Sequence, residues 1–104
     1  MVLYNVTVNV DDEIHEEWLA WMKDVHIPQV LDTGMFIENR ICRVEGFEEG
    51  GMTYAIQYLA PDRHHYNRYQ VEFAPALQKD HAEKYGSRAV AFRTVLDVIH
   101  QDKR

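Results

Sequence analysis

The chain contains very little cysteine: Cys42 is the only one among 104 residues. One thiol cannot form an intramolecular disulfide, and the sequence has no paired-cysteine spacing for a metal ion. Cys42 lies in a strand-like segment without an adjacent histidine, so a packed thiol explains it better than a nucleophile does. Because the N-terminus also lacks the basic and apolar regions of a signal peptide, we expect a cytoplasmic protein.

Long apolar runs and positive charge are scarce as well. No run of about 18 apolar residues is present, so we expect no membrane-spanning helix and no membrane partner. Lysine and arginine number 11 against 17 acidic residues, which gives a net charge of −6 without a basic stripe. A nucleic acid partner is therefore not expected. Glycine-rich phosphate loops and nucleophile-elbow motifs are missing too, which excludes the familiar catalytic classes that use them.

The first part of the chain changes from strand to helix periodicity. Residues 2–10 alternate between two faces, one of them apolar, as in a half-buried β-strand. Asp11 or Asp12 is then expected to cap a helix, and this helix should stop near His26 because Pro28 disfavours helical geometry before it. A short helical piece follows Pro28. The buried stripe of the main helix is predicted to contain Ile14, Trp18, Met22 and Val25.

Three further strands are expected. Residues 35–44 and 52–60 are two β-like runs, and the glycine-rich stretch 46–51 between them predicts an antiparallel hairpin. Residues 89–99 form the last strand. One of its faces is predicted to carry Ala91, Arg93, Val95 and Asp97, and the other Val90, Phe92, Thr94, Leu96 and Val98.

The second helix lies between the hairpin and the last strand. It is expected to open at Asp62, to kink or divide at Pro75 and to end at Gly86. Its apolar stripe is predicted to contain Tyr66, Tyr69, Phe73 and Leu77, and it continues weakly to Tyr85.

The resulting order βαββαβ predicts an α+β, ferredoxin-like domain over residues 1–100, with a solvated tail over residues 101–104. Two helices then cover one face of a four-stranded antiparallel sheet and leave the other face uncovered. That face is expected to have intermediate polarity, which suits a homodimer packed sheet against sheet. Its predicted side chains are Leu3, Asn5, Thr7, Asn9, Ala91, Arg93 and Val95.

Several stretches along nearly the whole chain resemble a bacterial family of unknown function. They are Tyr4-Asn5-Val6-Thr7-Val8, Trp18-Leu19-Ala20-Trp21-Met22, His26-Ile27-Pro28, Ile41-Cys42-Arg43-Val44, Tyr69-Gln70-Val71-Glu72-Phe73-Ala74-Pro75-Ala76-Leu77 and Ala91-Phe92-Arg93-Thr94. That family resembles the dimeric α/β-barrel group, which includes cofactor-free monooxygenases, EthD-like proteins, muconolactone isomerases, haem-handling proteins and ligand-sensing regulator domains. The resemblance implies a fold and a dimer more than a reaction.

One local element points to a site. Trp18 together with His26-Ile27-Pro28 is similar to the Trp…His-x-Pro helix end of the EthD-like proteins. His26 has a near-neutral ordinary pKa and is our candidate catalytic residue, a general base for a phenol-like or acidic carbon substrate. The alternative is a structural role, because a histidine in the last helical turn also interacts favourably with the helix C-terminus.

Aromatic side chains are the candidate ligand-binding residues. Trp18 is expected to shape a pocket, and tyrosine hydroxyls between helices and sheet are expected to orient a small ligand, or else the rings simply form the core. The candidate tyrosines are Tyr54, Tyr58 and Tyr69, alongside Tyr4 and Tyr66. Arg40, Arg43 and Arg93 fit either an anionic ligand or ion pairs.

The histidines do not suggest a metal site. His15 and His26 lie on one helical face but about 16 Å apart, and the adjacent His64 and His65 point in different directions. We therefore expect no metal ligands and no cofactor, although a zinc or iron site built from distant residues and a haem site remain open alternatives. Two functions remain: a homodimeric small-molecule binding or interaction module, and a cofactor-independent monooxygenase or isomerase with His26 as base.

Overall fold

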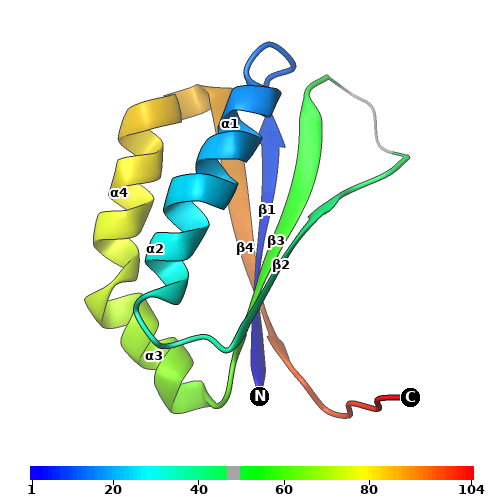
Figure 1. Cartoon of the computed structure of the whole chain (residues 1–104), viewed down its shortest axis with the longest axis vertical. Helices are drawn as coiled ribbons and strands as arrows, with labels where there is room; N and C mark the ends of the chain where they lie inside the picture. Colours follow the sequence, from blue (N-terminus) through cyan, green and yellow to red (C-terminus); the bar gives the residue numbers. More distant parts are fainter. Residues whose placement is uncertain (47–49) are drawn as a thin grey trace.

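The four strands of the protein form one antiparallel sheet, as expected. The computed structural model describes residues 1–46 and 50–104, so part of the predicted hairpin connection, residues 47–49, lies outside the described residues. The strand order is β2-β3-β1-β4, and all three pairings are antiparallel. This is the predicted ferredoxin-like arrangement (Figure 1). The strands are β1 (Val2–Val10), β2 (Glu38–Arg43), β3 (Met52–Ala60) and β4 (Ala89–Asp97).

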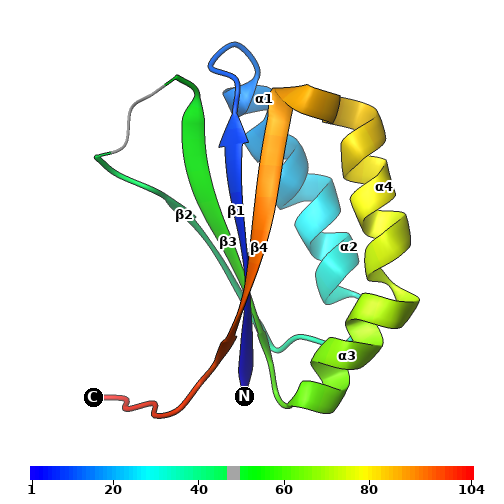
Figure 2. The ribbon, with the colours of Figure 1, turned by 180° about the vertical axis from the view of Figure 1, so that it is seen from behind.

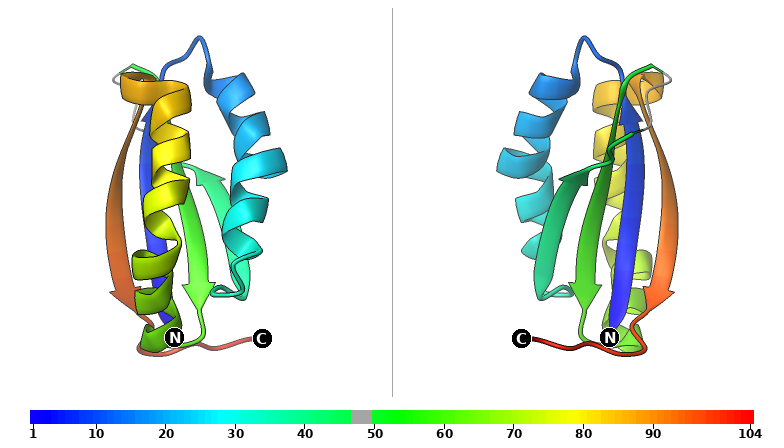
Figure 3. Two further views of the ribbon diagram at one scale, coloured as in Figure 1. Left: turned by 90° about the vertical axis from the view of Figure 1, so that its left-hand side faces the viewer. Right: turned by 90° about the vertical axis from the view of Figure 1, so that its right-hand side faces the viewer.

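Among the described residues, the helices all lie on one face of this sheet and leave the opposite face bare (Figures 2 and 3). The first crossover contains α1 (His15–Trp21), the π-helical segment η1 (Met22–His26) and α2 (Ile27–Leu31). The second contains α3 (Arg63–Glu72), α4 (Ala74–Tyr85) and the short 3-10 turn η2 (Gly86–Arg88).

The predicted limits of the second helix are confirmed. The Asp62 side chain caps α3 by accepting a hydrogen bond from the backbone N–H of His65 at 2.9 Å. The helix divides at Phe73, directly before the turn that contains Pro75, and Gly86 ends α4 with a φ of 55°. The capping residue, the proline and the glycine are therefore sufficient to predict where the helices of this part of the chain begin, divide and end.

The first helix differs from the prediction because it continues through Pro28. The backbone N–H of Ile27 donates to the carbonyl of Met22, five residues earlier, which defines a π turn just before the proline. This wider turn changes which side chains point inward. Val25, predicted to be buried, is 40% exposed, whereas His26 is only 9% exposed.

The structure also differs from the prediction at the N-cap of the first helix and at the ends of two strands. Neither Asp11 nor Asp12 caps the first helix, because α1 begins one turn later and its N-cap, Ile14, makes no side-chain cap hydrogen bond. Strand β2 is shorter than residues 35–44, since Met35 and Phe36 enter the core before the strand begins. Strand β4 ends at Asp97, before the predicted limit at residue 99.

The two faces of β4 are the reverse of the prediction. Arg93 pairs with Val6 and Ala91 pairs with Val8, so both lie on the helix-covered side. The bare face instead carries Phe92 and its alternating neighbours, which are among the exposed hydrophobic side chains of the protein. These are Val90 at 62%, Phe92 at 64% and Leu96 at 43% exposure.

The core fills the space between the sheet and the helices. Trp18 is completely buried there, and its ring lies 5.1 Å from that of Tyr54. A second aromatic cluster surrounds Tyr4. Its rings belong to Phe36, Tyr58, Tyr66 and Tyr69. Among the described residues, no helix is long and apolar enough to cross a membrane.

Gly51 supplies a first test of this fold, because a side chain at this position has no room. Its φ is +75°, and an added Cβ would lie 2.7 Å from both the Asn9 Oδ1 and the Val10 carbonyl oxygen. Gly51→Ala should lower the free energy of unfolding by about 2–3 kcal/mol. Gly34→Ala is the matched control, because Gly34 has a φ of +78° but no atom within 4 Å of its Cβ position. Equal losses in urea unfolding of the two variants would contradict the predicted clash.

Candidate functional site

A small cavity lies in the interior between the sheet and the helices. Its volume is about 40 Å³, well below the roughly 300–1,000 Å³ of most small-molecule pockets. The more exposed of its polar lining residues, Gln78, His81 and Arg93, belong to α4 and β4, which places its solvent side between these two elements. The lining residues are Tyr4, Val6, Val8, Met22, His26, Val30, Ile56, Tyr58, Tyr69, Leu77, Gln78, His81, Ala91 and Arg93.

His26 reaches this cavity from the π turn. Its ring stacks on Trp21 at 5.1 Å, and its Nδ1 is buried without a hydrogen-bond partner in the described part of the chain. Burial lowers the pKa of His26 to about 4; His81 and Arg93 also lower it, and Asp80 opposes them. His26 is therefore neutral at pH 7, with one N–H and one lone pair available.

His81 is the site residue that we did not predict from the sequence. It lies on α4, its ring centroid is 5.9 Å from that of His26, and its Nε2 accepts a hydrogen bond from Trp18 Nε1 at 3.0 Å. Burial, followed by the charge of Arg93, lowers the pKa of His81. The signal was present in the sequence, because His81 lies four residues after Leu77 and four before Tyr85 on the predicted stripe.

Arg93 is the only lysine or arginine among the residues that line the cavity. We had expected it on the bare face, where it was a candidate for an anionic ligand or an ion pair. It instead belongs to the helix-covered face of β4. Its positive charge disfavours protonation of both histidines and provides an attraction for an electron-rich ligand group.

The predicted site residues fall into two groups. His26, Tyr58 and Tyr69 line the cavity directly. Trp18 and Tyr54 lie behind it: Trp18 holds His81, and the Tyr54 hydroxyl is 3.1 Å from Nδ1 of His15. These two residues therefore lie outside the cavity lining, and Trp18 alone of the two is hydrogen-bonded to a lining residue.

Two of the three tyrosines that line the cavity, Tyr58 and Tyr69, are held in the phenol form. Burial raises the pKa of Tyr58, and the neighbouring Tyr69 and Tyr4 raise it further. Burial likewise raises the pKa of Tyr69, with a further contribution from Tyr4. Near neutral pH both side chains are therefore hydrogen-bond donors and acceptors without charge.

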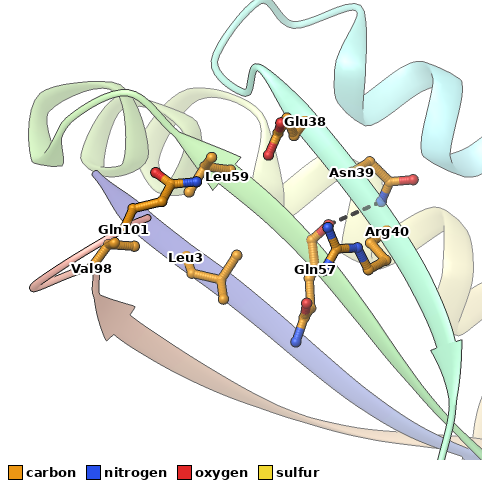
Figure 4. Close-up of a pocket in the computed structure, with 8 residues that line it drawn as sticks. All are labelled: Leu3, Glu38, Asn39, Arg40, Gln57, Leu59, Val98 and Gln101. Carbon is orange, nitrogen blue, oxygen red and sulfur yellow. Dashed lines mark hydrogen bonds between the residues drawn. The ribbon is translucent and has the colours of Figure 1, made fainter. Parts of the chain in front are cut away.

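A larger hollow of about 390 Å³ lies on the bare face of the sheet (Figure 4). The tail that follows β4 forms one of its walls through Val98 and Gln101. Arg40 and Glu38 of β2 add one charge of each sign, and the Asn39 amide donates to the Gln57 carbonyl at 3.2 Å. Its volume suits a small ligand, but it contains no histidine, tyrosine or cysteine that would provide proton-transfer or nucleophilic chemistry.

Two of the other histidines have polar partners away from the cavity. His65 Nδ1 contacts the Asp62 carboxylate at 2.7 Å, and His15 contacts Tyr54. Within residues 1–46 and 50–104, no group of three or more histidine, cysteine, aspartate or glutamate side chains is placed to hold a metal ion. The polar side chains that line the cavity carry imidazole, phenol, amide and guanidinium groups.

Comparison with known proteins agrees with the geometry of the fold. A family model described as Domain of unknown function (DUF4286) matches residues 1–99. No curated protein matches the chain. HapK from Hahella chejuensis has a similar structure, with a TM-score of 0.74 at 9% identity over 100% of this chain and 98% of that one.

Two further solved structures share this architecture. An ethyl tert-butyl ether D (EthD) family protein from Bacillus halodurans has a TM-score of 0.65 and 12% identity, over 90% of this chain and 97% of its own. A dimeric ferredoxin-like protein from an uncultured marine organism has a TM-score of 0.66 and 11% identity, covering 97% of each chain. At these identities the likeness establishes the fold, and it confirms the predicted ferredoxin-like class.

Proposed function

This chain belongs to the DUF4286 family of unknown function, and from that premise we propose that it is a homodimer that binds a small organic molecule between its sheet and its helices. The observation that carries the proposal is the buried, unpaired Nδ1 of His26 in the cavity wall. A buried polar atom without a partner is costly to a fold, and a ligand that pairs with it removes this cost. Arg93 and the neutral phenols supply further polar contacts.

The proposed ligand needs more room than the closed cavity offers. Leu77 and Gln78 of α4 are half-buried lining residues on the same side as the exposed Arg93. Rotation of these two side chains enlarges the cavity without breaking a strand pairing. We therefore place ligand entry between α4 and β4.

The homodimer is proposed through the bare sheet face. Phe92, Val90 and Leu96 expose apolar surface there, beside polar neighbours such as Asn5 and Thr94. This mixture is typical of protein interfaces, which are about as apolar as ordinary surface but contain buried aromatic anchors. The dimeric ferredoxin-like neighbour supports the same assembly for a protein of this fold.

A second candidate function is cofactor-independent proton transfer, as in monooxygenases and isomerases. It is favoured by a neutral His26 that lies beside His81 and the Tyr58 phenol in one cavity. His26 would take a proton from an acidic O–H or C–H group, and Tyr58 would orient the substrate oxygen. Exchange of solvent deuterium into a bound ligand, lost in His26→Gln, would support this activity; unchanged exchange in the variant would refute His26 as the base.

Ligand binding is tested by melting curves with small phenols, carboxylic acids and enolisable ketones. A compound that binds the cavity should stabilise the wild type by about 2–3 kcal/mol at a hundredfold excess over its Kd. His26→Gln should remove most of this shift, because the variant loses the imidazole that pairs with the ligand. His64→Gln is the matched control, since His64 is exposed on α3. The proposal fails if no compound shifts the wild type, or if His26→Gln keeps the full shift.

A further inference from the structure

The hydrogen bond between Trp18 and His81 determines where His81 carries its proton. An indole N–H is only a donor, so His81 Nε2, 3.0 Å from Trp18 Nε1, must hold a lone pair. The neutral ring then carries its proton on Nδ1. Trp18 is 0% exposed, so water does not provide this N–H with an alternative acceptor.

The same contact opposes protonation of His81. A second proton on Nε2 would break the bond and leave the Trp18 donor buried without a partner. The charge of Arg93 on β4 acts in the same direction, because it lowers the pKa of His81. His26 of η1 lies 5.9 Å away and is neutral. The uncharged rings of Trp18, Trp21 and Tyr85 also lie beside His81, at 6.4, 6.0 and 5.7 Å.

We propose that Trp18 is a positioning residue that holds His81 in the single Nδ1–H tautomer, so that the cavity combines a fixed donor from His81 with the lone pair of His26. The ligand class that fits this pair carries a carbonyl oxygen next to an acidic hydroxyl or C–H group, as in an enolisable diketone. The carbonyl accepts from His81 Nδ1–H, and the acidic proton faces the His26 lone pair. This ligand class rests on the proposed function, whereas the tautomer is a property of the ligand-free protein.

The tautomer is read from a long-range ¹H–¹⁵N correlation spectrum of the ¹⁵N-labelled, ligand-free protein. The wild type should show His81 protonated on Nδ1 and unprotonated on Nε2, as a single form at pH 8, with the ring becoming protonated only below the pKa of an ordinary histidine. Trp18→Phe should release the ring, with protonated Nε2 populated and a pKa closer to that of an ordinary histidine. Trp21→Phe is the matched control, because Trp21 also lies beside both histidines but acts through its ring face and edge.

A mixed or Nε2–H tautomer in the wild type overturns the positioning role. An unchanged spectrum in a folded Trp18→Phe protein overturns it as well, and if that variant does not fold, the wild-type spectrum alone decides. The ligand class is tested by melting curves with acetylacetone and with its 3,3-dimethyl derivative, which lacks the acidic central C–H and cannot form the conjugated enol. A shift with acetylacetone alone supports the class, whereas equal shifts or none overturn it. Since the tautomer is measured without ligand, its failure is distinct from failure to bind any small molecule.

Discussion

Phe92→Glu is expected to leave the protein monomeric at concentrations where the wild type is a dimer. Phe92 is 64% exposed on the bare sheet face, with Val90 and Leu96 on the same face of β4. In the homodimer that we propose, Phe92 is an aromatic anchor, and its replacement by an unpaired carboxylate should raise the dimer dissociation constant at least about 100-fold. Analytical ultracentrifugation at micromolar protein measures this change directly.

Val71→Glu is the control for the added charge. Val71 is a 78% exposed apolar residue, but it lies on α3, on the opposite side of the molecule from the bare face. This variant should remain dimeric. Dissociation of both variants would place the interface elsewhere, and a monomeric wild type would refute the homodimer itself. Because Phe92 contributes little to the monomer core, its replacement should leave the helical content unchanged.

The second large effect is a loss of stability in mild acid. His26 has a pKa of about 4 in the folded protein, compared with 6.5 for an unperturbed histidine. Between these values the unfolded chain binds a proton that the folded chain does not, so the free energy of unfolding falls as the pH falls. From this residue alone the loss should be about 2 kcal/mol between pH 7 and pH 5. The lowered pKa of His81 acts in the same direction.

The measurement is urea unfolding at pH 7, 6 and 5, a range that ends above the ordinary titration of most carboxylates. His26→Gln should flatten the dependence, because glutamine does not bind a proton in either state. His64→Gln should retain the full slope, since that side chain is exposed. A wild type with constant stability from pH 7 to pH 5 would contradict a buried neutral His26.

Local sequence signals were enough to predict that the four strands and the second helix are present. They were not enough to predict how the first helix passes Pro28. Pro28 correctly marks a disturbance, but proline rules alone predict an end and not a π turn that continues the helix. Whether the helix ends or continues through a π turn depends on which side chains pack against the sheet. Val25 and His26 are adjacent in the sequence. The predicted buried stripe contained Val25, which is exposed, and did not contain His26, which is buried.

The position of Arg93 was missed for a related reason. The alternating residues of β4 are of mixed polarity on both faces, so hydrophobicity favoured burial of the Phe92 face. The register with β1 decides the question, and it places Arg93 beside Val6 under the helices. His81 was missed although its spacing was visible, because a single histidine on an apolar stripe is usually a core or surface residue. The hydrogen bond from Trp18, which the sequence does not reveal, distinguishes His81 from such a residue.

The π turn also has a consequence for how the family can be compared. A π turn is one residue longer than the α-helical turn that it replaces, so a relative with a one-residue deletion in residues 22–26 would have a regular helix. The wide turn thus absorbs the extra residue, and the helical segments on either side of it keep their orientation. The length of this segment in a relative therefore predicts whether the helix contains the same wide turn, which in this chain carries His26 to the cavity lining.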